Sequence, residues 1–236
     1  MREGQTSGVA EYGSCFVVCD GMGGHQAGEV ASKLAVDSFL DAFYRKSLVE
    51  TDTARRVATT LAVVNQLVYE QAASSPELEG MGTTIVGVVI GGSHGVVFNV
   101  GDSRCYRVHS NQMEQLSEDH SLVNDLVQAH VITSEEARTS PRKNVLTRAV
   151  GNELSVEAAI RSVEVRVGDR FLLCSDGLSN FVVDGEIATA LSADHPRDTC
   201  HQLITLANER GGTDNITAMA VFCLSAGWSL GSRGHW

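Results

Sequence analysis

Three short apolar runs in this chain, typical of buried strands, each adjoin an aspartate in a bend rich in glycine or asparagine. The segments are Cys15–Gly21, Phe171–Gly177 and Gly211–Cys223, and their aspartates are Asp20, Asp176 and Asp214. Each aspartate alone is compatible with an ordinary turn, because Asp-Gly is a strong turn signal. Three segments of the same construction predict one oxygen-rich metal site assembled from distant parts of the chain. Carboxylates without a Cys or His cluster favour Mg²⁺ or Mn²⁺ over Zn²⁺.

The first of these segments leads into a stretch with four glycines and a histidine within eight residues, Gly21 to Gly28. Glycine permits backbone conformations that other residues avoid and lets a ligand approach the main chain closely. An aspartate at the end of a buried strand, in such a bend, can present its carboxylate to a hard cation. Taken alone, this stretch is equally compatible with a turn that binds nothing.

The remaining pattern predicts an α+β domain in which paired helices cover antiparallel strands. Helical spacing is found at 28–44, 51–73, 186–191 and 197–209. In the first helix the expected buried stripe is Val30, Leu34, Phe39, Leu40 and Phe43.

Strand patterns occupy 15–19, 83–90, 96–100, 104–109, 112–116, 157–165, 171–175 and 215–223. Short turn signals separate the four strands between residues 83 and 116, among them Gly91-Gly92 and Gly101-Asp102. These four strands are therefore predicted to form an antiparallel meander.

The segment from about residue 120 to residue 150 differs from its surroundings, because it is polar and is interrupted by Pro141. It contains two short helical stretches, Leu122–Gln128 and Ser134–Arg138. A segment of this kind between strands is typical of a mobile surface flap, and we use that name for it. We expect one domain over residues 1–224, which includes the flap, and a flexible tail rich in Gly and Ser over residues 225–236.

Composition excludes several other classes of protein. The formal net charge of −11 disfavours nucleic acid as a partner, since phosphate backbones require clusters of Lys and Arg. No segment has the apolar length of a membrane span, and the N-terminus lacks the apolar core of a signal peptide. The six cysteines form no Cys-x-x-Cys pair and most lie in apolar strand patterns, which predicts free thiols in a reducing cytoplasm. We expect a monomer.

Five motifs together resemble, in order and spacing, those of the metal-dependent type 2C protein serine/threonine phosphatases. They are Asp20–His25, Gly82–Thr84, Val100–Arg104, Ser175–Gly177 and Gly212–Asn215. The resemblance runs from about Arg2 to Cys223, and Met22 is typical of the bacterial branch. It implies two packed antiparallel sheets flanked by helices on both outer faces, with the metal site at one edge of the sandwich.

The resemblance also implies the chemistry. Two Mn²⁺ or Mg²⁺ ions would activate a water that attacks phosphoserine or phosphothreonine directly, without a phosphoenzyme. Asp20 would bridge the ions and Gly21 would offer its backbone carbonyl. Asp176 and Asp214 would complete the shell. Asp119 matches the ligand of a third ion, although it is also compatible with a loop residue or a cap for the helix that follows.

The general acid is open between two interpretations of His25. Animal relatives carry a histidine at the position of Met22, and His25 matches a histidine of bacterial relatives. An imidazole suits protonation of a leaving group at neutral pH, but His25 is equally compatible with a hydrogen bond to the turn. We expect His120 to be structural. Asp102 and Arg104 are expected to form an internal ion pair or to hold the core edge.

The N-terminus departs from the family pattern. Arg2 matches the arginine that binds the substrate phosphate in relatives, but Gln5, Thr6 and Ser7 stand where an acidic metal ligand is expected. The first strand is also expected to be incomplete. Glu3 or Glu11 would have to substitute for the missing acid.

Two functions from different classes follow from these observations. The first is an active phosphatase acting on phosphoserine and phosphothreonine proteins, with a serine/threonine kinase as its opponent. The alternative is a catalytically weak phosphatase-like domain that binds phosphoproteins or regulates a partner. The missing N-terminal acid is its only support, while retention of Asp20, Asp176 and Asp214 favours the enzyme.

Overall fold

The computed structural model describes residues 9, 11–110, 112–212 and 214–224. Its strands are β1 (Ser14–Val18), β2 (Gly21–Met22), β3 (Gly82–Thr83), β4 (Ile85–Gly91), β5 (His94–Val100), β6 (Arg104–His109), β7 (Gln112–Gln115), β8 (Ala159–Glu164), β9 (Arg170–Cys174) and β10 (Ala218–Phe222). Its helices are α2 (His25–Phe43), α3 (Thr53–Ala72), α4 (Leu122–Gln128), α5 (Ser134–Thr139), α6 (Asp176–Ser179), α7 (Asp184–Ala190), α8 (Pro196–Glu209) and a 3₁₀ turn at Pro76–Leu78. The predicted tail lies outside the described residues.

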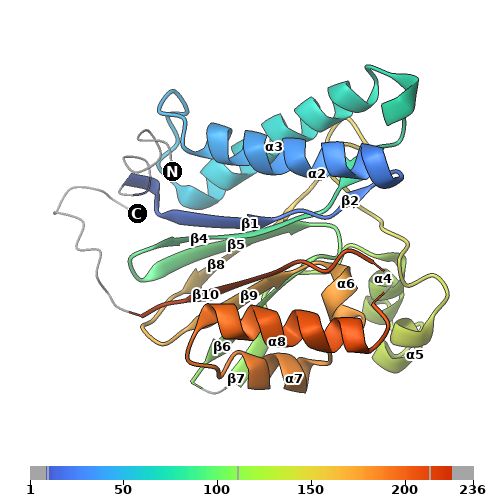
Figure 1. Cartoon of the computed structure of the whole chain (residues 1–236). Coiled ribbons are helices and arrows are strands. Elements are labelled where there is room, and N and C mark those ends of the chain that lie inside the picture. The colour runs from blue at the N-terminus through green and yellow to red at the C-terminus, as the bar shows by residue number, and fades with distance from the viewer. Residues whose placement is uncertain (1–8, 10, 111, 213, 225–236) are drawn as a thin grey trace.

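Two four-stranded antiparallel sheets form the centre of the molecule, in the orders β1-β4-β5-β8 and β10-β9-β6-β7. Helices α2 and α3 cover the outer face of the first sheet, and α7 and α8 cover that of the second (Figure 1). This arrangement confirms the predicted sandwich of two sheets between helical layers. Within the described residues, every helix falls short of the length and apolarity that a membrane crossing requires.

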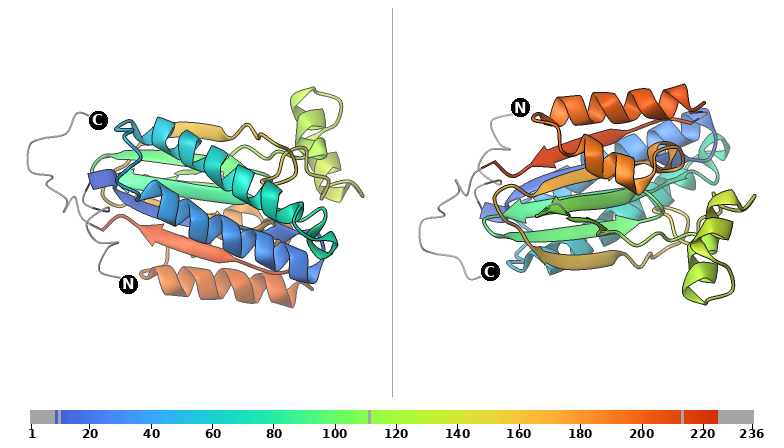
Figure 2. Two further views of the ribbon diagram at one scale, coloured as in Figure 1. Left: turned by 90° about the horizontal axis from the view of Figure 1, so that it is seen from above. Right: turned by 90° about the horizontal axis from the view of Figure 1, so that it is seen from below.

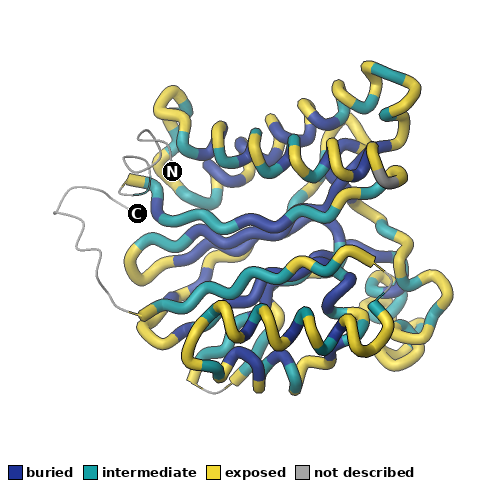
Figure 3. Tube along the Cα trace, in the orientation of Figure 1, coloured by how far each residue is buried: buried dark blue, intermediate teal, exposed yellow. Residues whose placement is uncertain are grey.

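Strands β4, β5 and β9 are buried along most of their length, and Figure 3 shows this burial in the middle of the sandwich. In β4, Val86 and Val88 pack between the sheets, whereas Ile85 and Val89 pack beneath α2 and α3. The alternation follows from the two-residue period of a strand. It explains why the strand sequences are continuous apolar runs rather than alternating ones.

The buried face of α2 differs from the predicted stripe. Val30 is 39% exposed, so its assignment to the core was wrong, while Phe39 and Phe43 are fully buried as expected. The face against the sheet begins with three buried alanines at four-residue spacing, Ala27, Ala31 and Ala35. Small side chains let the helix lie close to the sheet, and a pattern based on large apolar residues does not detect them.

The predicted four-strand meander is also wrong, although every pairing in it is antiparallel. Strand β4 pairs with β5 and β6 pairs with β7, but the second neighbour of β5 is β8 and that of β6 is β9. The chain therefore crosses from one sheet to the other between Val100 and Arg104. A turn signal shows where a strand ends, but it does not show which sheet the next strand joins, because that choice depends on distant strands.

The flap contains both predicted helices, α4 and α5. Ser121 caps α4, and Thr133 and Glu136 form a capping box at the start of α5. Both views in Figure 2 show these two helices projecting at one end of the sandwich. The mobility of the flap stays a prediction.

Candidate metal centre

Four aspartates follow or precede strands at the end of the sandwich where α6 and the flap lie. Asp20 follows β1, Asp102 follows β5, Asp176 follows β9 and Asp214 precedes β10. Burial, and then the negative charges of Asp176 and Asp214, raise the pKa of Asp20 to about 7. Burial and then Asp214 also raise the pKa of Asp176. The structure therefore brings together the three aspartates that the sequence singled out.

Asp102 belongs to the same cluster, which the sequence interpretation missed. Burial, followed by the charges of Asp176 and Asp119, raises the pKa of Asp102 to about 7. The signal was present in the sequence, because Asp102 ends an apolar run beside a glycine in the same way as Asp20. The expected Asp102–Arg104 ion pair is wrong: the ion pair of Arg104 is with Asp119.

The cluster fits a divalent cation through its charge and its donor atoms. Within the described residues, no three His, Cys, Asp or Glu side chains are placed to hold an ion as they stand. Burial and the mutual repulsion of the carboxylates raise the pKa values of Asp20, Asp102 and Asp176, and the charge of Arg104 opposes the shift of Asp102 only in part. A divalent cation would remove that repulsion, and carboxylate oxygens are the donors that Mg²⁺ and Mn²⁺ prefer.

Two threonines, Thr83 in β3 and Thr84 directly after it, hold the main chain around Asp20. The carbonyl of Asp20 accepts hydrogen bonds from Thr84 N and from Thr83 Oγ1, each 2.8 Å long. Asp20 N donates to Thr84 Oγ1 at 3.0 Å, and this hydroxyl lies 2.7 Å from Ser103 Oγ. The threonines and Ser103 therefore connect the Asp20 bend to the Asp102 turn.

Gly21 is required by close packing. A Cβ at this position would lie 1.9 Å from the carbonyl oxygen of Gly28 in the first turns of α2. Any side chain would therefore separate β2 from α2 and displace the bend that carries Asp20. The role of the Gly21 carbonyl as a metal ligand stays a prediction.

The loops of Asp176 and Asp214 are joined in a similar way. Ser175 Oγ donates to the carbonyl of Asn215 at 3.2 Å and accepts from Thr217 N at 3.0 Å. A Cβ on Gly177 would lie 2.4 Å from the Asn215 carbonyl oxygen, so only glycine permits this approach. Asn180 Nδ2 donates to Asp176 Oδ2 at 3.0 Å and orients that carboxylate.

Asp119, the predicted ligand of a third ion, is occupied by cationic and polar partners. Arg104 Nε donates to its Oδ2 at 2.9 Å and Arg104 Nη2 donates to the same oxygen at 2.6 Å. Gln115 Nε2 donates to Oδ1 at 2.8 Å. Asp119 therefore forms an ion pair within the fold. Asp102 forms no ion pair with any residue that the structure describes.

His120 holds the Asp102 turn from both sides. Its backbone N donates to the carbonyl of Gly101 at 3.0 Å, and its ring Nδ1 accepts from Gly101 N at 3.2 Å. Burial, and then the charge of Arg148, lower the pKa of the imidazole, which keeps it neutral and able to accept. The expected structural role of His120 agrees with these contacts.

The remaining predicted site residues belong to the N-terminal part of the chain, which the structure describes only in part. His25 begins α2, directly after the positive-φ residues Gly23 and Gly24, so its backbone lies at the Asp20 bend. Arg2 and Glu3 lie outside the described residues. Glu11 precedes β1 and Asp20 follows it, so five strand residues at ~3.3 Å each separate them. The suggestion that Glu11 replaces the missing acid is therefore wrong.

Comparison with known proteins agrees with the fold. The family described as Protein phosphatase 2C matches residues 5–215. The serine/threonine phosphatase stp of Listeria innocua is 42% identical over 210 residues, which are 87% of this chain and 82% of that protein. The crystal structure of the Mycobacterium tuberculosis serine/threonine phosphatase PstP/Ppp superposes with a TM-score of 0.81 at 36% identity, covering 88% of each chain.

A further solved structure contains metal. The catalytic domain of the serine/threonine protein phosphatase PstP in complex with two manganese ions superposes with a TM-score of 0.80 at 34% identity, covering 89% of this chain and 88% of that one. The chain therefore belongs to the protein phosphatase 2C family. The predicted bacterial branch and the predicted enzyme class, a protein serine/threonine phosphatase, are confirmed.

Proposed function

We propose that this chain hydrolyses phosphoserine and phosphothreonine residues of proteins with Mn²⁺ or Mg²⁺ held by Asp20, Asp176 and Asp214. One observation supports the assignment of the site: the carboxylates of Asp20, Asp176 and Asp214 come together from the two sheets, where burial and their mutual repulsion raise the pKa values of Asp20 and Asp176. When bound, a pair of divalent ions supplies charge neutralisation and an acidified water for attack on phosphorus.

The residues of the chain have separate tasks in this proposal. The carboxylate of Asp20 holds the centre of the cluster, on a bend fixed by Thr83 and Thr84. Asp176, oriented by Asn180, and Asp214 bind from the opposite sheet. For a third ion we propose Asp102 beside Asp176 in place of Asp119, since Asp119 is paired with Arg104.

For the leaving group we propose that His25 donates the proton and that Arg2 binds the phosphate. His25→Ala would then slow phosphopeptides by roughly 100-fold, the lower range for general acids. It would slow p-nitrophenyl phosphate much less, because nitrophenolate leaves without a proton. Equal losses on both substrates would instead assign His25 to the turn.

We also propose the wider setting of the enzyme. Residues 1–224 would form one domain with a mobile flap, and a serine/threonine kinase would produce its substrates. All six cysteines are described and unpaired, which supports a reducing compartment, the cytoplasm. A monomer is the proposed state.

The test is an assay on a phosphothreonine peptide with EDTA, Mg²⁺ or Mn²⁺, alongside metal stoichiometry. Turnover should require the metal, and Asp20→Asn should abolish both turnover and metal binding. Asp37→Asn is a matched control, because Asp37 is exposed and paired with Lys33 on α2. Normal Mn²⁺ affinity in Asp20→Asn would refute the assignment. Peptide binding without turnover in wild type would favour the weak phosphatase-like domain.

A further inference from the structure

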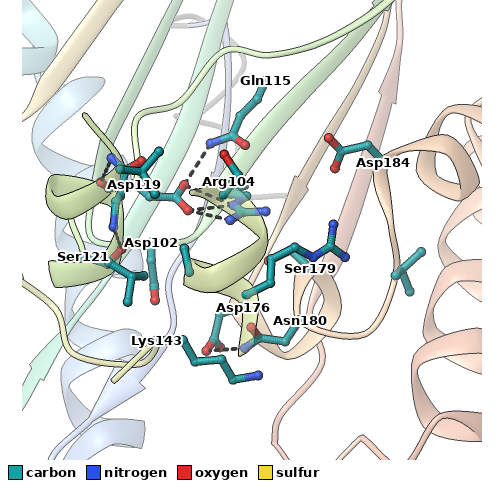
Figure 4. Close-up of a pocket in the computed structure, with 17 residues that line it drawn as sticks. Asp102, Arg104, Gln115, Asp119, Ser121, Lys143, Asp176, Ser179, Asn180 and Asp184 are labelled. Carbon is teal, nitrogen blue, oxygen red and sulfur yellow. Dashed lines mark hydrogen bonds and ion pairs between the residues drawn. The ribbon is translucent and has the colours of Figure 1, made fainter. Parts of the chain in front are cut away.

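A cavity of about 340 Å³ opens beside the carboxylate cluster, between the flap and the α6–α7 segment (Figure 4). Asp102 and Asp176 form part of its wall, so the cavity is continuous with the proposed metal centre. Its size lies in the range of small ligand pockets. A group bound there would sit next to a phosphate bound at the metal centre.

Two cations from the flap also line the cavity, Arg138 at the end of α5 and Lys143 shortly after it. Neither forms an ion pair with any residue that the structure describes. Arg104 also lines the cavity, but its charge is taken by Asp119. In a chain with a net charge of −11, these two cations without an ion-pair partner among the described residues line the cavity together with Asp184 and the carboxylates of the proposed metal centre.

The apolar part of the lining consists of Val123 and Val127 from α4, Ala137 from α5, and Val182. An extended peptide residue spans ~3.3–3.6 Å, so the residues next to a phosphothreonine fall within reach of a cavity that shares Asp176 with the metal centre. The aliphatic part of a Glu side chain suits the apolar part of the lining, and its carboxylate suits Arg138 and Lys143.

We propose that this cavity is a substrate subsite in which Lys143 and Arg138 bind a carboxylate flanking the phosphorylated residue. The enzyme then prefers phosphopeptides with acidic neighbours, against the repulsion expected from its own net charge. The inference rests on the proposed function, because the subsite is placed by a phosphate at the metal centre.

The experiment compares three phosphothreonine peptides that differ only in their flanks: two Gln on each side, two Glu before, or two Glu after the phosphothreonine. In wild type, kcat/KM for one of the Glu peptides should exceed that for the Gln peptide about fivefold, as expected for a favourable exposed ion pair. Added NaCl should reduce this ratio, since exposed charges are screened. All three peptides are assayed with the same protein sample. A loss of folded protein lowers each rate by the same factor and leaves the ratio unchanged.

Substitutions then locate the effect. Lys143→Gln and Arg138→Gln should each lower the ratio, and Lys143→Glu should make a Lys-flanked peptide the better substrate. Arg142→Gln is the matched control, because Arg142 is an exposed neighbour of equal charge that does not line the cavity. Its ratio should equal that of wild type.

Two results would overturn the subsite alone: equal kcat/KM for all three peptides in wild type, or a loss in Arg142→Gln as large as that in Lys143→Gln. Hydrolysis of none of the peptides with Mn²⁺ present would refute the proposed function itself. The two failures are therefore distinguishable.

Discussion

Strand β9 has an aspartate beyond each end, and the two have opposite surroundings. Asp169, before the strand, is 1% exposed and has an arginine and a histidine as partners: Arg107 Nη1 is 4.0 Å from its Oδ2 and His109 Nδ1 is 2.5 Å from its Oδ1. Asp176, after the strand, has other carboxylates as its charged neighbours. The strand has five residues, so the two ends lie roughly 17 Å apart.

The difference separates a structural carboxylate from a binding one. The fold itself supplies partners to Asp169, including a hydrogen bond of 3.0 Å from Arg166 N. At the Asp176 end the partners have to come from solution, because burying like charges without compensation is unfavourable. Burial alone does not distinguish the two ends, but the sign of the neighbouring charges does.

The largest effect is expected on metal binding. Asp176→Asn should reduce Mn²⁺ affinity and turnover by at least ~100-fold, since changes even outside the ligand shell of a metal site cost 10–100-fold. Asp169→Asn should leave the Mn²⁺ affinity of the folded protein unchanged. Calorimetric titration of both variants measures this, and similar Mn²⁺ affinities in the two would break the comparison.

For the stability of the metal-free protein, Asp169→Asn should have a larger effect than Asp176→Asn. In EDTA, Asp169→Asn should lower the free energy of unfolding by about 2 kcal/mol, the scale for hydrogen bonds that involve a charged group. Asp176→Asn should not lower it, because the substitution removes repulsion within the cluster. Urea denaturation monitored by circular dichroism gives both values. Greater destabilisation by Asp176→Asn would contradict the interpretation.

The pH dependence of the metal-free protein sharpens the same point. The pKa values of Asp20 and Asp102 are raised to about 7 in the folded state, whereas an unfolded aspartate titrates near ~3.9. Between these values the folded state binds more protons, so its stability should fall as pH rises from about 4 to about 7. Thermal melts in EDTA should therefore show a higher Tm at pH 5 than at pH 7.5, and Asp20→Asn should reduce the difference.

Saturating Mn²⁺ is the control for this pH effect. Bound metal favours the ionised carboxylates, so the Tm should no longer be higher at pH 5 than at pH 7.5. A Tm of the metal-free protein that rises from pH 5 to pH 7.5 would show that another group dominates.

The smallest effect is expected from the two histidines. His120→Ala removes the acceptor of Gly101 N and should loosen the Asp102 turn, for a loss of about 1 kcal/mol and less than tenfold in Mn²⁺ affinity. His109→Ala, at the Asp169 end, is the matched control and should leave Mn²⁺ affinity unchanged. A larger loss of Mn²⁺ affinity in His109→Ala than in His120→Ala would reverse the assignment of the two ends.

Local sequence predicted much of the fold. Strand β6 and helix α4 lie at the residues that the pattern indicated, and caps such as Thr133 with Glu136 are determined by neighbours a few residues apart. Asp20, Asp176 and Asp214 were recognised together because each adjoins an apolar run in a bend. The order of the motifs was enough to identify the family from the sequence. The bends that carry these residues require the same residue types at fixed positions.

Tertiary structure decided the partners. Arg104 pairs with Asp119 rather than with Asp102, which is only two residues away in the sequence. Between Asp102 and Arg104 the chain leaves one sheet and enters the other. Sequence spacing does not reveal such choices, because they depend on which distant strands pack together. The same applies to the two ends of β9: the sequence shows an aspartate beyond each, but only the packing of the sheets gives Asp169 an arginine and a histidine as partners and places Asp176 among carboxylates.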